Sequence, residues 1–125
     1  MKELIYIGIG GFFGAVARFA VSKMANNFTS TFPVGTLLVN ITGSFFLGFI
    51  LYSAILGKSI SPELRSFLTI GLIGAFTTMS TFSYETIRLF ETNNSLFAWG
   101  NIFLNIILCF GGIILGRNLA FLLIK

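Results

Sequence analysis

The stretch GLIGAFTTMSTFSY, from Gly71 to Tyr84, combines the apolarity of a membrane-spanning helix with a dense run of hydroxyl side chains. The uncharged part from Gly74 onward holds the hydroxyls of Thr77, Thr78, Ser80, Thr81 and Ser83. Glycines and adjacent threonines lower helix propensity, and threonine side chains compete for backbone hydrogen bonds. The stretch therefore predicts a membrane helix that breaks near its middle. Such breaks are tolerated where protein or a water-filled cavity satisfies the freed backbone groups, and they commonly mark ion or substrate sites.

The composition of the whole chain is that of an integral membrane protein. Of its 125 residues, 55% are hydrophobic and 10% are charged, and the mean hydropathy is +0.93. The 8 Lys and Arg residues fall mostly between apolar blocks, so the net charge of +4 provides no basic face for nucleic acid. The chain has no histidine and a single cysteine, Cys109, which gives no support for zinc clusters or thiol catalysis. We expect neither enzyme activity nor cofactor-dependent chemistry.

Four apolar blocks reach the about 20 residues that a spanning helix needs. They predict helices at about 4–24, 35–56, 66–90 and 96–124. The first is expected to be a retained helix and not a signal peptide. A polar loop, NNFTST at 26–31, and Pro33 precede the second helix, and a short loop at 58–65 precedes the third. Short connections make consecutive helices antiparallel neighbours, so we expect one four-helix transmembrane domain over 1–125 with both termini on one side.

Glycines recur in the predicted helices at spacings that suit close packing. Gly10 and Gly14, and likewise Gly112 and Gly116, have the small-xxx-small spacing that brings membrane helices into contact, within one subunit or between two. Four helices alone enclose little space. A polar path is therefore expected between subunits, which requires at least a dimer.

The basic residues give only a weak bias towards one orientation in the membrane. Five lie on the side of the termini and three on the opposite side of the predicted bundle. The first group is Lys2, Lys58, Arg65, Arg117 and Lys125, and the second is Arg18, Lys23 and Arg88. Under the positive-inside rule this division enforces neither orientation strongly.

Side-chain amides lie within two of the predicted helices. Asn40, in the segment GTLLVNITGSFF, needs hydrogen-bond partners, which either a neighbouring helix or a polar path would supply. Thr36 and Asn40 share one helix face with Gly43. Asn101 and Asn105 form a polar stripe one turn apart on the fourth helix. These residues are candidates for a polar path through the membrane.

The acidic residues are expected at helix ends or in loops, and none at mid-membrane. They are Glu3, Glu63, Glu85 and Glu91. Without a mid-membrane carboxylate, a proton-coupled exporter is disfavoured. Hydroxyls, amides and the electropositive edges of Phe76 and Phe82 suit a small anion instead. Arg18 lies roughly 9 Å from the end of the first predicted helix, so it either snorkels to the interface or attracts anions to a vestibule.

Three segments resemble, in order and spacing, the signatures of the Fluc (CrcB-type) family of fluoride channels. They are GGFFGAVARF (10–19), PVGTLLVNITGSFFLGF (33–49) and GLIGAFTTMSTFS (71–83). The resemblance covers nearly the whole chain. It implies a dual-topology dimer of two antiparallel subunits in the cell membrane, with two narrow pores that passively export cytoplasmic fluoride and lower its toxicity. It also implies a structural sodium ion at the dimer interface.

The resemblance assigns roles to individual residues. Main-chain carbonyls of Gly74 and Thr77 would hold the sodium ion, since carbonyl oxygens suit a hard cation. Asn40 falls on the family's pore asparagine, and its facing phenylalanines fall on Met79 and Phe82. The methionine is a departure, because a thioether lacks an electropositive ring edge. The expected fluoride path comprises Asn40, Phe82, Met79, Ser80, Thr81, Thr36, Asn101, Asn105 and Arg18.

Two alternatives to a homodimeric fluoride channel stay open. The first is a small four-helix transporter, which the lack of a mid-membrane acid disfavours. The second is a partner subunit that pairs with a related chain in a heterodimeric fluoride channel. Met79 keeps the second alternative open, because a chain without one pore aromatic could depend on another subunit for a complete pore.

Overall fold

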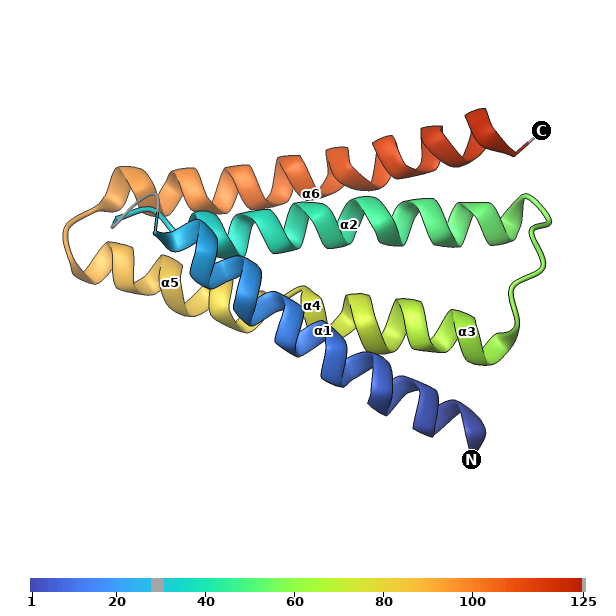
Figure 1. The fold of residues 1–125 in the computed structure, drawn as a ribbon. Coiled ribbons are helices and arrows are strands. Elements are labelled where there is room, and N and C mark those ends of the chain that lie inside the picture. Colours follow the sequence, from blue (N-terminus) through green and yellow to red (C-terminus); the bar gives the residue numbers. More distant parts are fainter. Residues whose placement is uncertain (28–30, 125) are drawn as a thin grey trace.

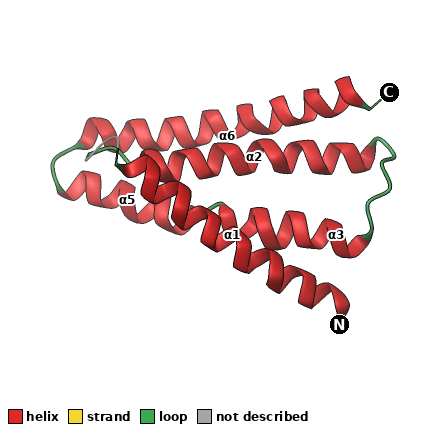
Figure 2. Cartoon of the chain, in the orientation of Figure 1, coloured by secondary structure: helices red, strands yellow, loops and turns green. Residues whose placement is uncertain are grey.

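All of the regular secondary structure in the computed structural model, which describes residues 1–27 and 31–124, is helical (Figure 1, Figure 2). The polar loop predicted at 26–31 lies partly outside the described residues, and Lys125 lies wholly outside them. The described residues contain four spans long and apolar enough to cross a membrane: α1 (Lys2–Asn26), α2 (Val34–Ile55), a third span over Pro62–Glu91, and α6 (Ser95–Leu123). The prediction of an all-α integral membrane protein is confirmed, and the chain is a multi-pass membrane protein.

The third span is not one regular helix. It contains in order α3 (Pro62–Ser66), the π-helix η1 (Phe67–Ile73), α4 (Gly74–Phe76) and α5 (Met79–Glu91). The span begins inside the loop predicted at 58–65. The Ser61 hydroxyl accepts a hydrogen bond from the Leu64 amide at 3.2 Å, and Pro62 occupies the first helical position, which suits proline. The loop after α2 is therefore shorter than expected.

The spans pack as two pairs that meet near the connections α1–α2 and α5–α6. Helix α2 runs alongside α6, and α1 crosses the third span at η1 and α4 (Figure 1). Both termini lie at the end of the molecule that also holds the α2–α3 connection, as predicted. The two pairs diverge towards that end, so the middle of the third span is where α1, α2 and the third span come together.

Glycines allow these pairs to pack backbone against backbone. A Cβ added at Gly10 would lie 2.5 Å from the Phe67 carbonyl oxygen on η1, and one added at Gly48 would lie 2.6 Å from the Ile113 carbonyl oxygen on α6. Both distances are shorter than any ordinary contact. A Cβ at Gly116 would likewise overlap the Phe45 carbonyl oxygen. The glycine motifs therefore pack helices within one chain.

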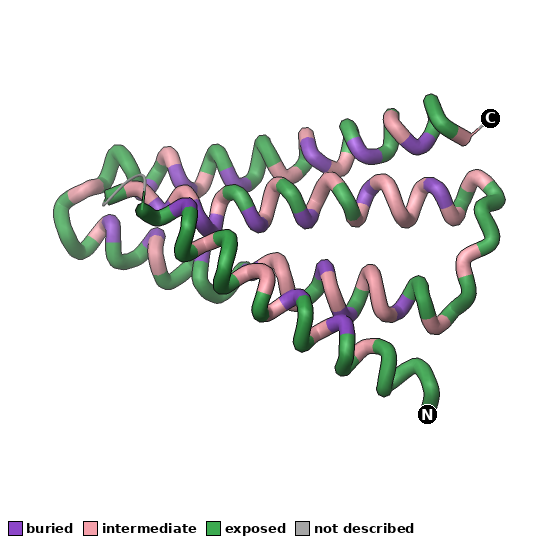
Figure 3. The backbone as a smooth tube through the Cα atoms, viewed as in Figure 1, coloured by how far each residue is buried: buried purple, intermediate pink, exposed green. Residues whose placement is uncertain are grey.

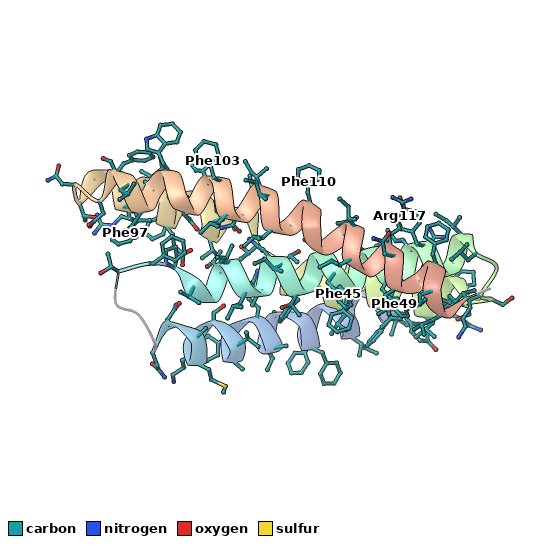
Figure 4. All side chains as sticks on the ribbon, turned by 90° about the horizontal axis from the view of Figure 1, so that it is seen from above. Phe45, Phe49, Phe97, Phe103, Phe110 and Arg117 are labelled. Atoms are coloured by element: carbon teal, nitrogen blue, oxygen red, sulfur yellow. The ribbon has the colours of Figure 1, made fainter. Side chains whose placement is uncertain are left out.

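The outer faces of the helices are apolar and exposed. Buried residues lie where helices face one another, and exposed residues follow the outside of the bundle (Figure 3). Phe103 and Phe110 on α6 are 57% and 69% exposed and project away from the bundle (Figure 4). Such faces suit contact with lipid.

Candidate functional site

The helix break lies at Thr77 and Thr78, near the midpoint of the third span. Thr77 has φ −80° and ψ 156°, and Thr78 has φ −152° and ψ 116°, so both are extended between α4 and α5. The predicted break is therefore confirmed. Gly71 and Gly74 stay helical. Gly71 instead packs against α1, where an added Cβ would lie 2.6 Å from the Ile7 carbonyl oxygen.

Several hydroxyls of the run stabilise the two helix ends at the break. Thr77 Oγ1 donates to the Ile73 carbonyl at 3.1 Å, at the end of α4. Thr78 Oγ1 caps α5 by accepting a hydrogen bond from the Thr81 amide at 3.2 Å. Thr78 Oγ1 also donates to Thr81 Oγ1 at 3.0 Å, so the proton of the Thr81 hydroxyl is free for another acceptor. Ser80 and Thr81 are both exposed.

Asn40 on α2 pairs with both polar groups of the Thr78 backbone. Its Oδ1 accepts from the Thr78 amide at 2.8 Å, and its Nδ2 donates to the Thr78 carbonyl at 3.2 Å. Asn40 Oδ1 thus replaces the acceptor that the Thr78 amide would have in a continuous helix, as a buried break requires. The Thr78 carbonyl, as the N-cap carbonyl of α5, gains a second donor in Asn40 Nδ2. Asn40 on α2 therefore stabilises the extended backbone at the break.

A chain of hydrogen bonds continues from Asn40 across α6 to α5. Asn40 Nδ2 donates to Asn105 Oδ1 at 3.0 Å, and Asn105 Nδ2 donates to Asn101 Oδ1 at 2.9 Å. Asn101 Nδ2 donates to Thr86 Oγ1 at 2.9 Å, which donates to the Phe82 carbonyl at 2.7 Å. Asn101 is fully buried and Asn105 is 5% exposed. The predicted polar stripe exists, and its amide donors are bonded to other protein groups.

An open cavity of ≈ 530 Å³ lies beside the break, between α2, α5 and α6. Its lining residues are uncharged: Asn40, Gly43, Ser44, Leu47, Thr77, Thr78, Met79, Phe82, Ile102, Asn105, Ile106 and Cys109. Phe82 is 8% exposed and belongs to the packed wall, whereas Met79 is 72% exposed and projects from it. The cavity therefore has a polar wall of amides and an exposed thioether at its edge.

Two contacts from other helices fix Thr77. Arg18 on α1 reaches the break, where its Nη1 donates to the Thr77 carbonyl at 3.4 Å. An added Cβ at Gly43 on α2 would overlap Thr77 Cγ2, so the threonine methyl occupies the notch that this glycine leaves. The snorkelling alternative for Arg18 is wrong, because its guanidinium turns inwards to the break.

The comparisons with known proteins agree over almost the whole chain. Residues 5–117 match the family described as CrcB-like protein, Camphor Resistance (CrcB). The chain belongs to the CrcB-like family. It is 47% identical over 117 residues to the fluoride-specific ion channel FluC of Methanococcus maripaludis, which covers 94% of each protein.

Two further relatives carry the same name. The fluoride-specific ion channel FluC of Methanococcus aeolicus is 43% identical over 125 residues, all of both proteins. FluC of Shewanella loihica is 43% identical over 122 residues, 97% of this chain and 98% of the relative. The similarity thus extends from the first helix to the last, as the resemblance in three segments implied.

In this CrcB-like chain, the structure brings together some of the predicted path residues and separates others. Asn40, Asn105, Met79 and Phe82 line the cavity, and Asn101 joins its hydrogen-bonded wall. The remaining candidates lie elsewhere: Ser80 and Thr81 at the exposed start of α5, Thr36 buried on α2, Arg18 at the break, and Gly74 exposed on α4.

Glu85 lines a separate pocket of this CrcB-like chain, and its depth within α5 is a feature that sequence reasoning missed. It lies within α5, about two turns before its end, and is partly buried. The Thr36 hydroxyl is a hydrogen-bond partner of its carboxylate, and Glu85 Oε2 is buried with no partner in the described part of the chain. The expectation that all acids lie at helix ends is therefore wrong for Glu85. The sequence signal was its three-residue spacing from Phe82, an aromatic residue that is buried on the same helix.

Proposed function

We propose that this chain is a fluoride-specific ion channel subunit of the cell membrane, and not an enzyme, which lets cytoplasmic fluoride leave passively and so lowers its toxicity. The observation that carries the proposal is the similarity to fluoride-specific ion channels over 94 to 100% of the chain. The small-transporter alternative has no comparable support.

The cavity beside the break is chemically suited to a small anion. Its lining has no charged side chain, so an anion there meets neither a trapping cation nor a repelling carboxylate. Because Asn40 and Asn105 already use their amide donors within the protein, we assign them to the wall of the path. Within the cavity the ring edge of Phe82 would then help to replace the water around fluoride, and the hydroxyls of Ser80 and Thr81 would do so outside it, at the exposed start of α5.

Passive export needs no coupled ion. Hydrogen fluoride enters as a neutral acid and dissociates in the more alkaline cytoplasm. A negative-inside membrane potential then drives the anion out, at about 2.3 kcal/mol per charge per 100 mV. Fluoride is small and strongly hydrated, and burial of an unpaired ion is very costly. Selectivity therefore depends on the donors that line the path.

The functional unit in this proposal is a dual-topology homodimer of antiparallel subunits. Met79 is 72% exposed at the open side of the cavity, so one chain leaves the cavity without a wall there. A second copy placed over this side would complete two equivalent paths. The shared two-fold axis would pass close to the helix breaks, where Gly74 is exposed.

A structural sodium ion at that axis is part of the same proposal. The Thr78 amide, which would bond the Gly74 carbonyl in a continuous helix, is bonded to Asn40 instead, and the Thr77 carbonyl lies in extended backbone. Both carbonyls thus fit a hard cation, and two copies would supply four oxygens. A cation bound there would link the two breaks across the dimer.

Met79 favours a second candidate function, the partner subunit of a heterodimeric fluoride channel. The family's facing phenylalanines supply two ring edges, and this chain supplies only Phe82. A related chain with both aromatics could supply the ring edge that is missing from a pore formed by two copies of this chain. The two candidates differ in whether this chain conducts fluoride alone.

The deciding experiment is ion efflux from liposomes that contain only this purified chain. We expect fluoride efflux on addition of a potassium ionophore, with no chloride efflux at a comparable rate. Chloride release as fast as fluoride release would contradict the proposal. Absent efflux that returns when a related chain is reconstituted with it would favour the heterodimer instead.

A further inference from the structure

We propose that Arg18 restricts the cation site at the helix break to monovalent cations. The inference rests on the proposed function in one respect, since it assumes the sodium site between the two breaks. It concerns what this chain's own arginine does to that site. Nothing in the chemistry of neutral carbonyl ligands alone would reject a divalent cation of similar size, because calcium also prefers oxygen ligands.

The packing of α1 places the Arg18 guanidinium at the break. One turn earlier, Gly14 lies against the third span, where an added Cβ would overlap the Leu72 carbonyl oxygen and lie 3.0 Å from Ala75 Cβ. Helix α1 therefore approaches α4 closely just before Arg18. From there the side chain reaches the Thr77 carbonyl, with Nη1 at 3.4 Å from its oxygen.

The Thr77 carbonyl can accept the hydrogen bond from Arg18 and bind a cation at the same time. A carbonyl oxygen has two lone pairs, and the long contact with Arg18 uses one of them. The second lone pair is then available for a cation. The guanidinium and the cation would share one oxygen atom, and their charges would lie within a few ångströms of each other.

The charge of Arg18 is not neutralised within the protein. The ion pair of the described residues joins Arg88 to Glu91 at 3.1 Å, and Arg18 forms no salt bridge with any described carboxylate. An arginine stays protonated under all ordinary conditions. Its repulsion of a neighbouring cation scales with the charge of that cation, so a divalent ion is opposed twice as strongly as a monovalent one. In a dimer two such arginines act on one site.

The test is thermal unfolding of the purified chain in detergent, titrated with NaCl or CaCl₂ against choline chloride at constant ionic strength. The wild-type chain should gain stability with Na⁺ in a saturable way and gain none with Ca²⁺. In Arg18→Gln, which removes the charge, the half-saturating Na⁺ concentration should fall by about tenfold or more, and Ca²⁺ should now stabilise the chain. Arg88→Gln is the matched control, because Arg88 pairs with Glu91 at the end of α5, and it should behave as wild type.

Several outcomes would overturn the inference. One is wild-type stabilisation by Ca²⁺ at or below the concentrations at which Na⁺ acts, and this arm needs no variant to fold. Others are an unchanged or weaker Na⁺ response in Arg18→Gln, or no response to Na⁺ in the wild type. Fluoride efflux from liposomes made with the same wild-type preparation separates the two proposals. If the chain conducts fluoride but its stability shows no preference for Na⁺ over Ca²⁺, the channel function stands and only the role of Arg18 is rejected.

Discussion

At the scale of single residues, Asn40 is the side chain on which the geometry of the site depends. It bonds both polar groups of the Thr78 backbone and also Asn105, so one amide ties α2, the break and α6 together. The pairing of a side-chain amide with an extended peptide explains how a break can exist in the middle of a membrane span. Asn40 therefore has a structural role at the break, which is separate from any contact with fluoride.

Replacement of Asn40 by alanine should both destabilise the protein and abolish fluoride efflux. The Thr78 amide would lose its partner, and an unsatisfied buried group costs about 1–3 kcal/mol. Thermal unfolding in detergent and liposome efflux are the measurements, with the exposed Asn118→Ala as control. A variant as stable and as active as wild type would contradict the role of Asn40 in the break.

The sequence predicted the break but not the contacts that hold it. The break follows from local chemistry, since two adjacent threonines after glycines favour extended backbone. The bond between Asn40 and Thr78 joins residues 38 positions apart, so it depends on how α2 packs against the third span. The contact of Arg18 could not be predicted for the same reason. The sequence gives its distance from the end of the first helix, but the carbonyl that it bonds belongs to another span.

Glu85 shows a second limit of sequence reasoning. The end of the third helix was predicted at about residue 90, which placed this acid close to the interface. The side chain is nevertheless partly buried against Thr36, because the half-helix α5 turns that face towards α2. Hydropathy predicts the length of a span. It does not predict which face of a half-helix after a break packs against its neighbours, because that depends on tertiary structure.

At the scale of elements, the third span combines two kinds of helix, α and π, with one non-helical step. The π-helix η1 and the short α4 bring the chain to Thr77, where extended backbone interrupts the helical hydrogen bonds before α5 begins. The position of Thr77 is set from outside the span, by Arg18 at its carbonyl and by Gly43 at its methyl. The break is thus a property of three helices, and it should respond to changes on α2.

Gly43→Ala should disturb the break, and Thr77→Ser should restore it. The added Cβ would overlap Thr77 Cγ2, and overpacking of this kind costs about 1–3 kcal/mol. Serine lacks that methyl, so the double variant should recover most of the lost stability and of the fluoride efflux. A double-mutant cycle of melting temperatures measures the coupling.

The control for that cycle is Gly111→Ala on α6. An added Cβ at Gly111 meets no atom within 4 Å, so this variant should be as stable as wild type or slightly more stable, because alanine favours a helix. Additive effects of Gly43→Ala and Thr77→Ser, with no recovery in the double variant, would show that the methyl does not set the position of the break.

At the scale of the whole molecule, the distribution of basic residues bears on how the chain inserts. Arg18 no longer counts among the basic residues at the end opposite the termini, because its guanidinium lies at the break. The sequence count then becomes five to two, with Lys2, Lys58, Arg65, Arg117 and Lys125 on the side of the termini and Lys23 and Arg88 on the opposite side. The bias is larger than the five-to-three division suggested, and it favours termini in the cytoplasm.

We therefore expect both orientations in the membrane, with the termini cytoplasmic in the larger share. A cysteine appended to the C-terminus, in a Cys109→Ala background, can be labelled in intact cells with a membrane-impermeant maleimide to measure the share that faces outwards. Replacing Lys2, Lys58 and Lys125 by glutamine leaves two basic residues for each end in the sequence count, so the two shares should become nearly equal. Arg18→Gln should leave them unchanged, because its charge lies at neither end. If every copy of the wild-type chain faced one way, an antiparallel dimer would require a related chain of opposite orientation, and the homodimer proposal would fail.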